Sequence, residues 1–116
     1  MKFKLAIFVL LIAFGCHTEE TNSTGCNSEN PLEMQWMKDW VNELQNCVCT
    51  ISIFQADFNG KTIFWPLMTD PLCQSVIDNV PVYNCMGDTI LTLNNYKDWT
   101  AFNAAVTNRK IIYACK

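Results

Sequence analysis

Histidine and basic side chains are scarce in this sequence. Its 116 residues include one histidine, His17, and eight Lys and Arg against eleven Asp and Glu. A chain with no basic excess lacks the charge that neutralises nucleic-acid phosphates. Because His17 falls in a polar, aperiodic stretch, the sequence also excludes Ser-His and Cys-His nucleophile pairs and histidine-based zinc sites. We therefore predict no nucleic-acid partner, no metal or other cofactor, and no enzymatic activity.

One catalytic class remains open, since paired carboxylates can work without histidine. The aspartates of the chain fall at or near predicted turns, loops and helix starts, where Asp forms local hydrogen bonds. This placement favours a structural role for Asp57, Asp70, Asp78, Asp88 and Asp98.

Glycine and proline are also scarce, with four of each. Their low number excludes a collagen-like or linker-like chain. Half of the residues are apolar and 12% are aromatic, which excludes an intrinsically disordered protein. The length suffices for one small domain with a buried core.

No apolar run is long enough to cross a bilayer as a helix. Lys2 and Lys4 precede an apolar run at 5–14, about ten residues where a spanning helix needs about twenty. A charged start followed by a short apolar run is typical of a secretory signal peptide. We predict a lipoprotein signal peptide over 1–15, a flexible tether over 16–29 and a single domain over 30–116.

The residues before Cys16 fit two kinds of processing site. Ala13 and Gly15 are the small residues that an ordinary signal peptidase needs. They also resemble a bacterial lipobox, in which a small residue precedes a cysteine that receives lipid and becomes the mature N-terminus. Cysteine parity favours the lipobox, because lipidation of Cys16 leaves an even set that can close as disulfides in an exported protein. That set is Cys26, Cys47, Cys49, Cys73, Cys85 and Cys115.

Removal of the signal peptide makes the chain more acidic. Without Lys2 and Lys4 it has six basic and eleven acidic side chains, a net charge of −5. Such a chain gains nothing electrostatically from an anionic bilayer, so diacylglycerol and an N-acyl chain on Cys16 would supply the attachment. We predict a bacterial cell-envelope protein anchored in the outer membrane. Glu19 and Glu20 are either a signal for export to the cell surface or ordinary acids of a solvated tether.

A helix is predicted over 30–46. Asn30 can cap it, Pro31 fits its first position and Glu33 can reach back to the cap. At helical spacing its apolar residues share one face and its polar residues the other. The apolar face is Trp36, Met37, Trp40, Val41 and Leu44, and the polar face is Gln35, Lys38, Asn42, Gln45 and Asn46.

Two antiparallel hairpins follow. Residues 48–65 contain β-branched and aromatic side chains around the turn signal Asn59-Gly60, and residues 80–93 show the same pattern. Pro66 ends the first hairpin, because proline cannot donate to a strand ladder. This leaves a loop over 66–79, long enough to be either functional or held by a disulfide.

The chain ends with a second helix and a strand. Asn94 and Asn95 can cap the helix, Asn108 is a left-handed terminator, and a strand follows at 110–115. The fold class is thus α+β: an N-terminal amphipathic helix packed on an antiparallel sheet of two hairpins plus a C-terminal strand, held by disulfides.

Three short motifs lie within 26–116. They are Asn30-Pro31-Leu32-Glu33, then Trp36-Met37-Lys38 before a hairpin, then Pro81-Val82-Tyr83-Asn84-Cys85-x-Gly87. Together these motifs resemble a family of small Bacteroidota lipoproteins that is defined only as a domain of unknown function. The resemblance implies a lipid-anchored envelope protein and carries no activity.

Cys47-Val48-Cys49 has the spacing of a thiol pair that exchanges disulfides if one thiol has a lowered pKa. Two cysteines at a helix end and a strand start can equally each bond a different residue. The sequence alone does not choose among the pairings of six cysteines. We expect a bond between Cys73 and Cys85, a bond from Cys115 to the 47–49 region, and Cys26 pinning the end of the tether to the domain.

The sequence supports three functions from different classes. The first is non-enzymatic binding or scaffolding of another envelope macromolecule, with the 66–79 loop as contact surface. The second is inhibition of a secreted hydrolase by a rigid, disulfide-held loop. The third is a thiol-disulfide oxidoreductase that uses Cys47 and Cys49. For the first function the partner-binding candidates are Leu67, Met68 and Leu72.

Overall fold

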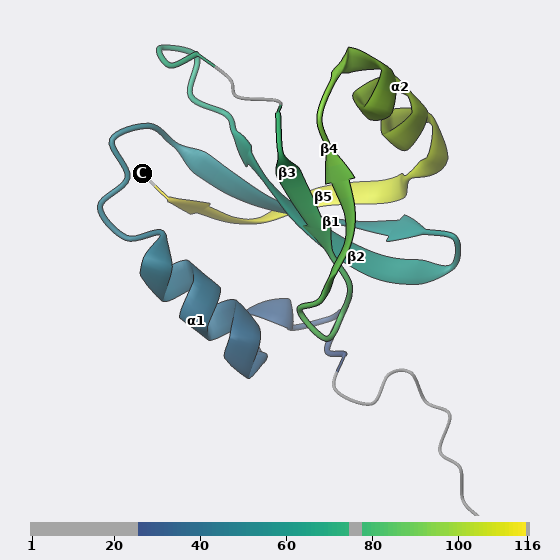
Figure 1. Ribbon diagram of the computed structural model, residues 1–116. Coiled ribbons are helices and arrows are strands. Elements are labelled where there is room, and N and C mark those ends of the chain that lie inside the picture. Colours follow the sequence, from purple (N-terminus) through teal and green to yellow (C-terminus); the bar gives the residue numbers. More distant parts are fainter. Residues whose placement is uncertain (1–25, 75–77, 116) are drawn as a thin grey trace, which may run out of the picture.

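One antiparallel sheet of five strands forms the centre of the computed structural model, which describes residues 26–74 and 78–115 (Figure 1). The predicted signal peptide, Cys16, Glu19 and Glu20 lie outside the described residues. The strands follow the order β4-β3-β2-β1-β5 across the sheet. In chain order the described elements are a 3-10 helix η1 (Pro31–Glu33), α1 (Gln35–Glu43), β1 (Ile51–Phe58), β2 (Lys61–Met68), β3 (Val80–Tyr83), β4 (Thr89–Leu93), α2 (Tyr96–Ala105) and β5 (Thr107–Cys115). The predicted α+β class with an antiparallel sheet is confirmed.

The β1–β2 hairpin forms around the turn that the sequence predicts. Asn59 and Gly60 have φ angles of 50° and 75°, the left-handed conformations that a two-residue hairpin turn requires. The strands pair without a break from Phe58 opposite Lys61 to Ile51 opposite Met68. Asn and Gly tolerate these angles better than other residues, so local chemistry fixes the register of this hairpin.

Pro66 does not end the hairpin, so that prediction and the start of the loop at 66 are wrong. β2 continues to Met68, and Pro66 pairs with Ile53 of β1. The bond from the Thr69 N–H to the Thr50 carbonyl, 3.0 Å, sets the alternation of the ladder. Hydrogen-bonded and non-hydrogen-bonded pairs alternate along the two strands, and Thr50 and Thr69 form a hydrogen-bonded pair. Pro66 and Ile53, three positions along, therefore form a non-hydrogen-bonded pair, in which the Pro66 nitrogen faces away from β1. β1 therefore loses no hydrogen bond to the proline.

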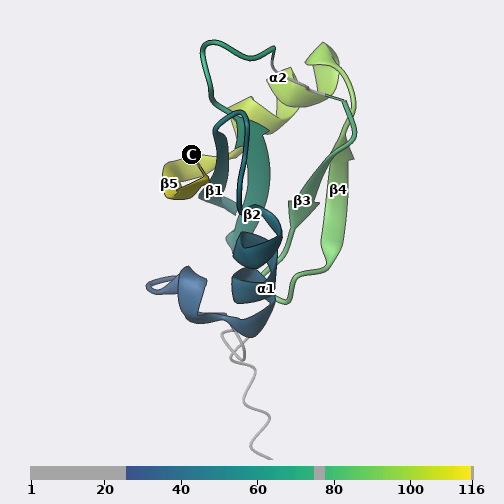
Figure 2. The same ribbon diagram turned by 90° about the vertical axis from the view of Figure 1, so that its left-hand side faces the viewer.

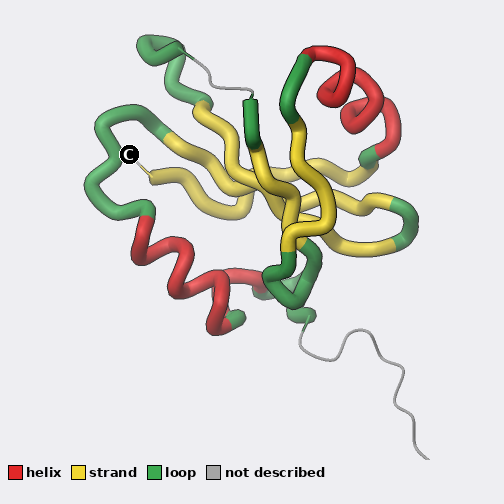
Figure 3. Tube along the Cα trace, viewed as in Figure 1, coloured by secondary structure: helices red, strands yellow, loops and turns green. Residues whose placement is uncertain are grey.

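The two helices cover opposite faces of the sheet (Figures 2 and 3). Successive strand residues point to opposite faces, and the neighbours Phe64 and Trp65 of β2 show this directly. Phe64 is buried in one cluster with Met37 of α1. Trp65 is buried in another, with Phe102 of α2 edge-on to its ring at a centroid distance of 4.9 Å. A fully buried residue on each face explains the unbroken apolar run at this point of β2.

α1 packs with the face that helical spacing predicts. Met37 is fully buried, and the other four apolar residues of that face are half-buried against the same cluster. The five polar residues assigned to the opposite face are all exposed. The amphipathic pattern therefore determines which side of the helix meets the sheet.

The start of this helix differs from the prediction of one capped helix over 30–46. Met34 is extended, with ψ at 138°, and separates η1 from α1. The Asn30 side chain forms no cap bond within the described residues, and its N–H instead donates to Asn27 Oδ1 at 2.9 Å. The break buries the Met34 side chain in the cluster beneath α1, which a continuous amphipathic helix would not require.

Asn95 caps α2 as predicted, since its Oδ1 accepts a hydrogen bond from the Asp98 N–H at 2.9 Å. Asn108 has the predicted left-handed φ, 55°, but it does not end the helix, because β5 already begins at Thr107. It lies where the β1–β5 register shifts, and its Nδ2 donates to Asp57 Oδ2 at 2.7 Å. The left-handed residue accommodates a β-bulge, so β5 is longer than the predicted strand at 110–115.

Candidate functional site

Three disulfides join the six cysteines of the domain. The pairs are Cys26–Cys85, Cys47–Cys115 and Cys49–Cys73, with Cα–Cα distances of 5.0, 5.9 and 6.1 Å. Two expectations are confirmed: Cys115 bonds to the 47–49 region, and Cys26 is pinned to the domain. Because Cys47 and Cys49 bond different residues, they do not form with each other the disulfide of an exchanging pair.

The expected bond between Cys73 and Cys85 is wrong, and the strand register explains why. Ile51, the first residue of β1, pairs with Met68, the last residue of β2. The segment before β1 therefore lies beside the segment after β2, and Cys49 meets Cys73. Cys85 lies in the β3–β4 turn instead, where its carbonyl accepts a hydrogen bond from Trp36 Nε1 of α1 at 3.0 Å.

A short segment between α1 and β1 is fixed on both sides of one exposed side chain. The Val48 side chain is 98% exposed, although both neighbouring cysteines are half-buried in disulfides. Thr50 is held through both backbone groups: its N–H donates to Asp70 Oδ2 at 3.2 Å, and its carbonyl accepts from the Thr69 N–H at 3.0 Å. Val48 therefore projects from a backbone that is anchored at 47, 49 and 50.

Asp70 organises the turn on the other side of the Cys49–Cys73 disulfide. Its Oδ1 accepts a hydrogen bond from the Leu72 N–H at 2.9 Å, and its carbonyl accepts from the Cys73 N–H at 3.1 Å. Leu72 is 94% exposed at the tip of this turn. The Asp70 carboxylate and the sulfurs of Cys49 and Cys73 lie within 4.8 Å of one another, but sulfurs bonded to each other are not the thiolates that bind metals.

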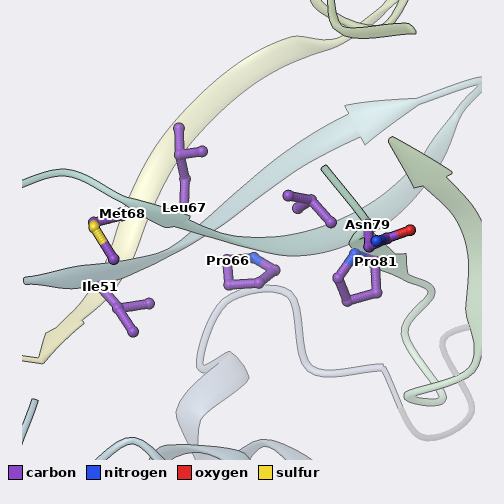
Figure 4. A pocket seen from close by; sticks show the side chains of 7 residues that line it. Ile51, Pro66, Leu67, Met68, Asn79 and Pro81 are labelled. Carbon is purple, nitrogen blue, oxygen red and sulfur yellow. The ribbon is translucent and has the colours of Figure 1, made fainter. Parts of the chain in front are cut away.

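A shallow hollow of about 220 Å³ lies beside these turns, between β2 and the start of β3 (Figure 4). Its lining is mostly aliphatic, and its residues come from β1, β2, β3 and the end of the preceding loop. They are Ile51, Pro66, Leu67, Met68, Asn79, Val80 and Pro81.

Two prolines explain why the sheet opens at this point. In the described part of the chain, β2 and β3 pair at one position, Phe64 with Tyr83. Two residues further along each strand, that register would place Pro66 opposite Pro81. The alternation of the β1–β2 ladder directs the backbone groups of Pro66 toward β3, so this would be a hydrogen-bonded pair. Neither proline has an N–H to donate, so the ladder stops and the strands separate.

The three partner-binding candidates lie at one end of the sheet, in two settings. Leu67 and Met68 are half-buried strand residues of β2 that line the hollow, and Leu72 lies in the exposed turn. Val48, which the sequence did not single out, is a further exposed aliphatic residue at this end of the sheet. Its position between two cysteines was the available signal, because an aliphatic residue held between two disulfides has little room to fold inward. We call the segments 47–51, 66–74 and 79–81 the disulfide-held end.

The comparisons with known proteins add no relative. The chain matches no family model, no curated protein and no solved structure. The resemblance to the Bacteroidota lipoproteins therefore stays a prediction. No helix within 26–74 or 78–115 is both long and apolar enough to cross a membrane.

Proposed function

We propose that this protein is a non-enzymatic binding module of the bacterial cell envelope, anchored by lipid on Cys16, and that it contacts another macromolecule through the disulfide-held end. The observation that carries the proposal is the exposure of two aliphatic side chains beside one disulfide. Val48 is 98% exposed next to Cys49, and Leu72 is 94% exposed next to Cys73. Exposed apolar groups that gather at one place are typical of contact surfaces.

The rigidity of the disulfide-held end supports a binding role. Ordering a flexible side chain or loop costs free energy on association, and a surface that is already ordered avoids that cost. Two disulfides and the hydrogen bonds of Asp70 hold the backbone on both sides of the exposed residues. Val48 and Leu72 would form the centre of the interface, and the hollow lined by Leu67 and Met68 would receive a side chain of the partner.

The predicted tether joins the domain at the side opposite to the turn at 69–74, which supports a contact surface at the disulfide-held end. Cys26, the first described residue, is bonded to Cys85 in the β3–β4 turn. The 26–34 segment and this turn lie at the lower side of Figures 1 and 2, while the turn at 69–74 lies at the upper side. A lipid on Cys16 would leave the disulfide-held end free to face away from the membrane.

Crosslinking in intact cells tests the contact surface. We expect the native full-length protein to crosslink to a defined partner, and the double variant Val48→Ser/Leu72→Ser to lose at least nine-tenths of that product, about 1.4 kcal/mol or more. Ile111→Ser is the matched control, because it removes another exposed aliphatic side chain, 53% exposed on β5. Equal crosslinking by the double variant and the control would contradict the proposed surface.

The anchor is tested separately by the intact mass of the protein from its native membrane. We expect a chain that begins at Cys16 and carries lipid, with six further cysteines that alkylate only after reduction. A Cys16→Ser variant provides the control, since it removes the lipid site and leaves the six cysteines of the domain. An unlipidated native chain would overturn the anchoring part of the proposal.

A further inference from the structure

The exposed segment around Val48 is fastened to the domain by a disulfide on each side. Cys47 and Cys49, on either side of Val48, are disulfide-bonded to different parts of the domain. The peptide bond between Val48 and Cys49 therefore lies within a segment that is fastened at both ends. Cys47 is tied to the end of β5, 68 residues away in sequence, and Cys49 to the turn after β2, 24 residues away. Hydrolysis here consumes one water and leaves a Val48 carboxylate and a Cys49 amine. Both new ends stay fastened to the folded domain.

When a protease cuts this bond, the two new chain ends gain little conformational freedom, so the product is not readily released. The carboxylate end is held through Cys47–Cys115, and the amine end through Cys49–Cys73 and the two backbone hydrogen bonds of Thr50. The two ends therefore remain close, and the reverse reaction, which rejoins them and releases the water, is not opposed by chain entropy. A segment that remains bound whether cut or intact blocks the enzyme.

We infer that the partner of the disulfide-held end is a serine endopeptidase that cleaves after small aliphatic residues, and that Val48 fills its primary pocket as an inhibitor. This inference rests on the proposed function and names the class of partner. Val48 is 98% exposed between two disulfide-bonded cysteines, and a pre-ordered, exposed segment enters a protease cleft without the cost of ordering it. A β-branched aliphatic residue fits a small apolar pocket and not a deep aromatic or acidic one.

Leu72 would contribute a second contact on the enzyme surface. It lies next to Cys73, whose Cα is 6.1 Å from that of Cys49, so the two exposed residues flank the same disulfide. The described residues of the disulfide-held end carry one formal charge, that of Asp70, which already accepts two backbone hydrogen bonds. Recognition therefore depends on the fit of Val48 to the apolar pocket of the protease and not on charge.

Inhibition assays with the full chain test the inference. The probes are elastase, trypsin and chymotrypsin, whose primary pockets are small, acidic and large apolar respectively. We expect inhibition of elastase at nanomolar concentration, and roughly 10- to 200-fold weaker inhibition by Val48→Gly, the range that loss of pocket contacts produces. Val48→Lys should transfer inhibition from elastase to trypsin. Ile111→Ser on β5 is the control and should change neither the strength nor the specificity of inhibition.

The mass of the inhibitor after long incubation gives a second readout. We expect a species heavier by one water that remains in one piece until the disulfides are reduced and then separates at the Val48–Cys49 bond. The inference is overturned if the native chain inhibits none of the three enzymes, or if Val48→Lys leaves the specificity unchanged. Crosslinking that still depends on Val48 and Leu72 would then show that the proposed function stands with a different partner. If the chain neither inhibits these enzymes nor crosslinks through Val48 and Leu72, both the inhibitor inference and the proposed binding function are wrong.

Discussion

Gly87 lies directly against the indole ring of Trp36. A Cβ atom at Gly87 would come within 2.9 Å of Trp36 Cδ2, closer than Cβ atoms approach other atoms in proteins, and within 3.0 Å of Cγ. Gly87 also has a φ of 85°, in the left-handed region that glycine adopts without strain. The β3–β4 turn thus packs on α1 through a residue without a side chain. The Trp36 Nε1 bond to the Cys85 carbonyl and the Cys26–Cys85 disulfide meet at the same turn.

We expect Gly87→Ala to lower the free energy of unfolding by about 2–5 kcal/mol, the sum of left-handed strain and overpacking. Denaturant unfolding measures the loss. Gly60→Ala is the control, because Gly60 also has a positive φ, 75°, but its added Cβ would meet no atom within 4 Å. It should cost about 1–2 kcal/mol. Equal losses for the two variants would contradict the close packing of Gly87 on Trp36.

The opening between β2 and β3 follows from Pro66 and Pro81, so restoring their N–H groups should close it. We expect Pro66→Val/Pro81→Val to extend the ladder by two hydrogen bonds beyond Phe64 and Tyr83, each contributing about 1 kcal/mol. Amide hydrogen exchange should then show protection at both new amides. Each single variant supplies one donor and should gain about half. Rapid exchange at both new amides in the double variant would show that another contact holds the strands apart.

Most features that the sequence predicts correctly are determined by local chemistry, and the exceptions are the long-range disulfides of Cys115 and Cys26. The turn at Asn59 and Gly60, the cap at Asn95 and the buried face of α1 around Met37 each depend on residues a few positions apart. Backbone conformation, a side-chain oxygen near a free N–H, and helical spacing act over that range.

Apart from the break at Met34 in the predicted 30–46 helix and the role of Asn108, the errors concern contacts between distant residues. The partner of Cys73 depends on which strand ends lie side by side, and that follows from the β1–β2 register. The tolerance of Pro66 depends on which way its amide position faces, which is set by pairing with Ile53. Val48 acquires its exposure from two disulfides to distant parts of the chain.

Tyr83 provides a pH-dependent test of the α1 packing. Burial raises the pKa of Tyr83 above its ordinary value of 10.0, and the Glu43 carboxylate raises it further. Well below pH 10.0 the folded and unfolded chains both keep the phenolic proton, so the contribution of Tyr83 to stability does not change with pH. At higher pH the unfolded chain loses the phenolic proton first, so the free energy of unfolding falls until the folded pKa is passed. Compared from about pH 8 to about pH 11, the native protein should lose more stability than Tyr83→Phe. Parallel curves would contradict the burial of the hydroxyl.

Asp70 links the two segments that carry the exposed Val48 and Leu72 side chains, because its carboxylate accepts from the N–H groups of both Thr50 and Leu72. Asp70→Ala leaves these two donors without their acceptor, and we expect a loss of about 1–3 kcal/mol together with faster amide exchange at Leu72. Asp88→Ala is the charge-matched control, since Asp88 in the exposed β3–β4 turn bonds Asn84 through its backbone N–H and carbonyl. A destabilisation shared by both variants would point to net charge. A loss confined to Asp70→Ala, with weaker crosslinking to the partner, would tie the order of this turn to binding.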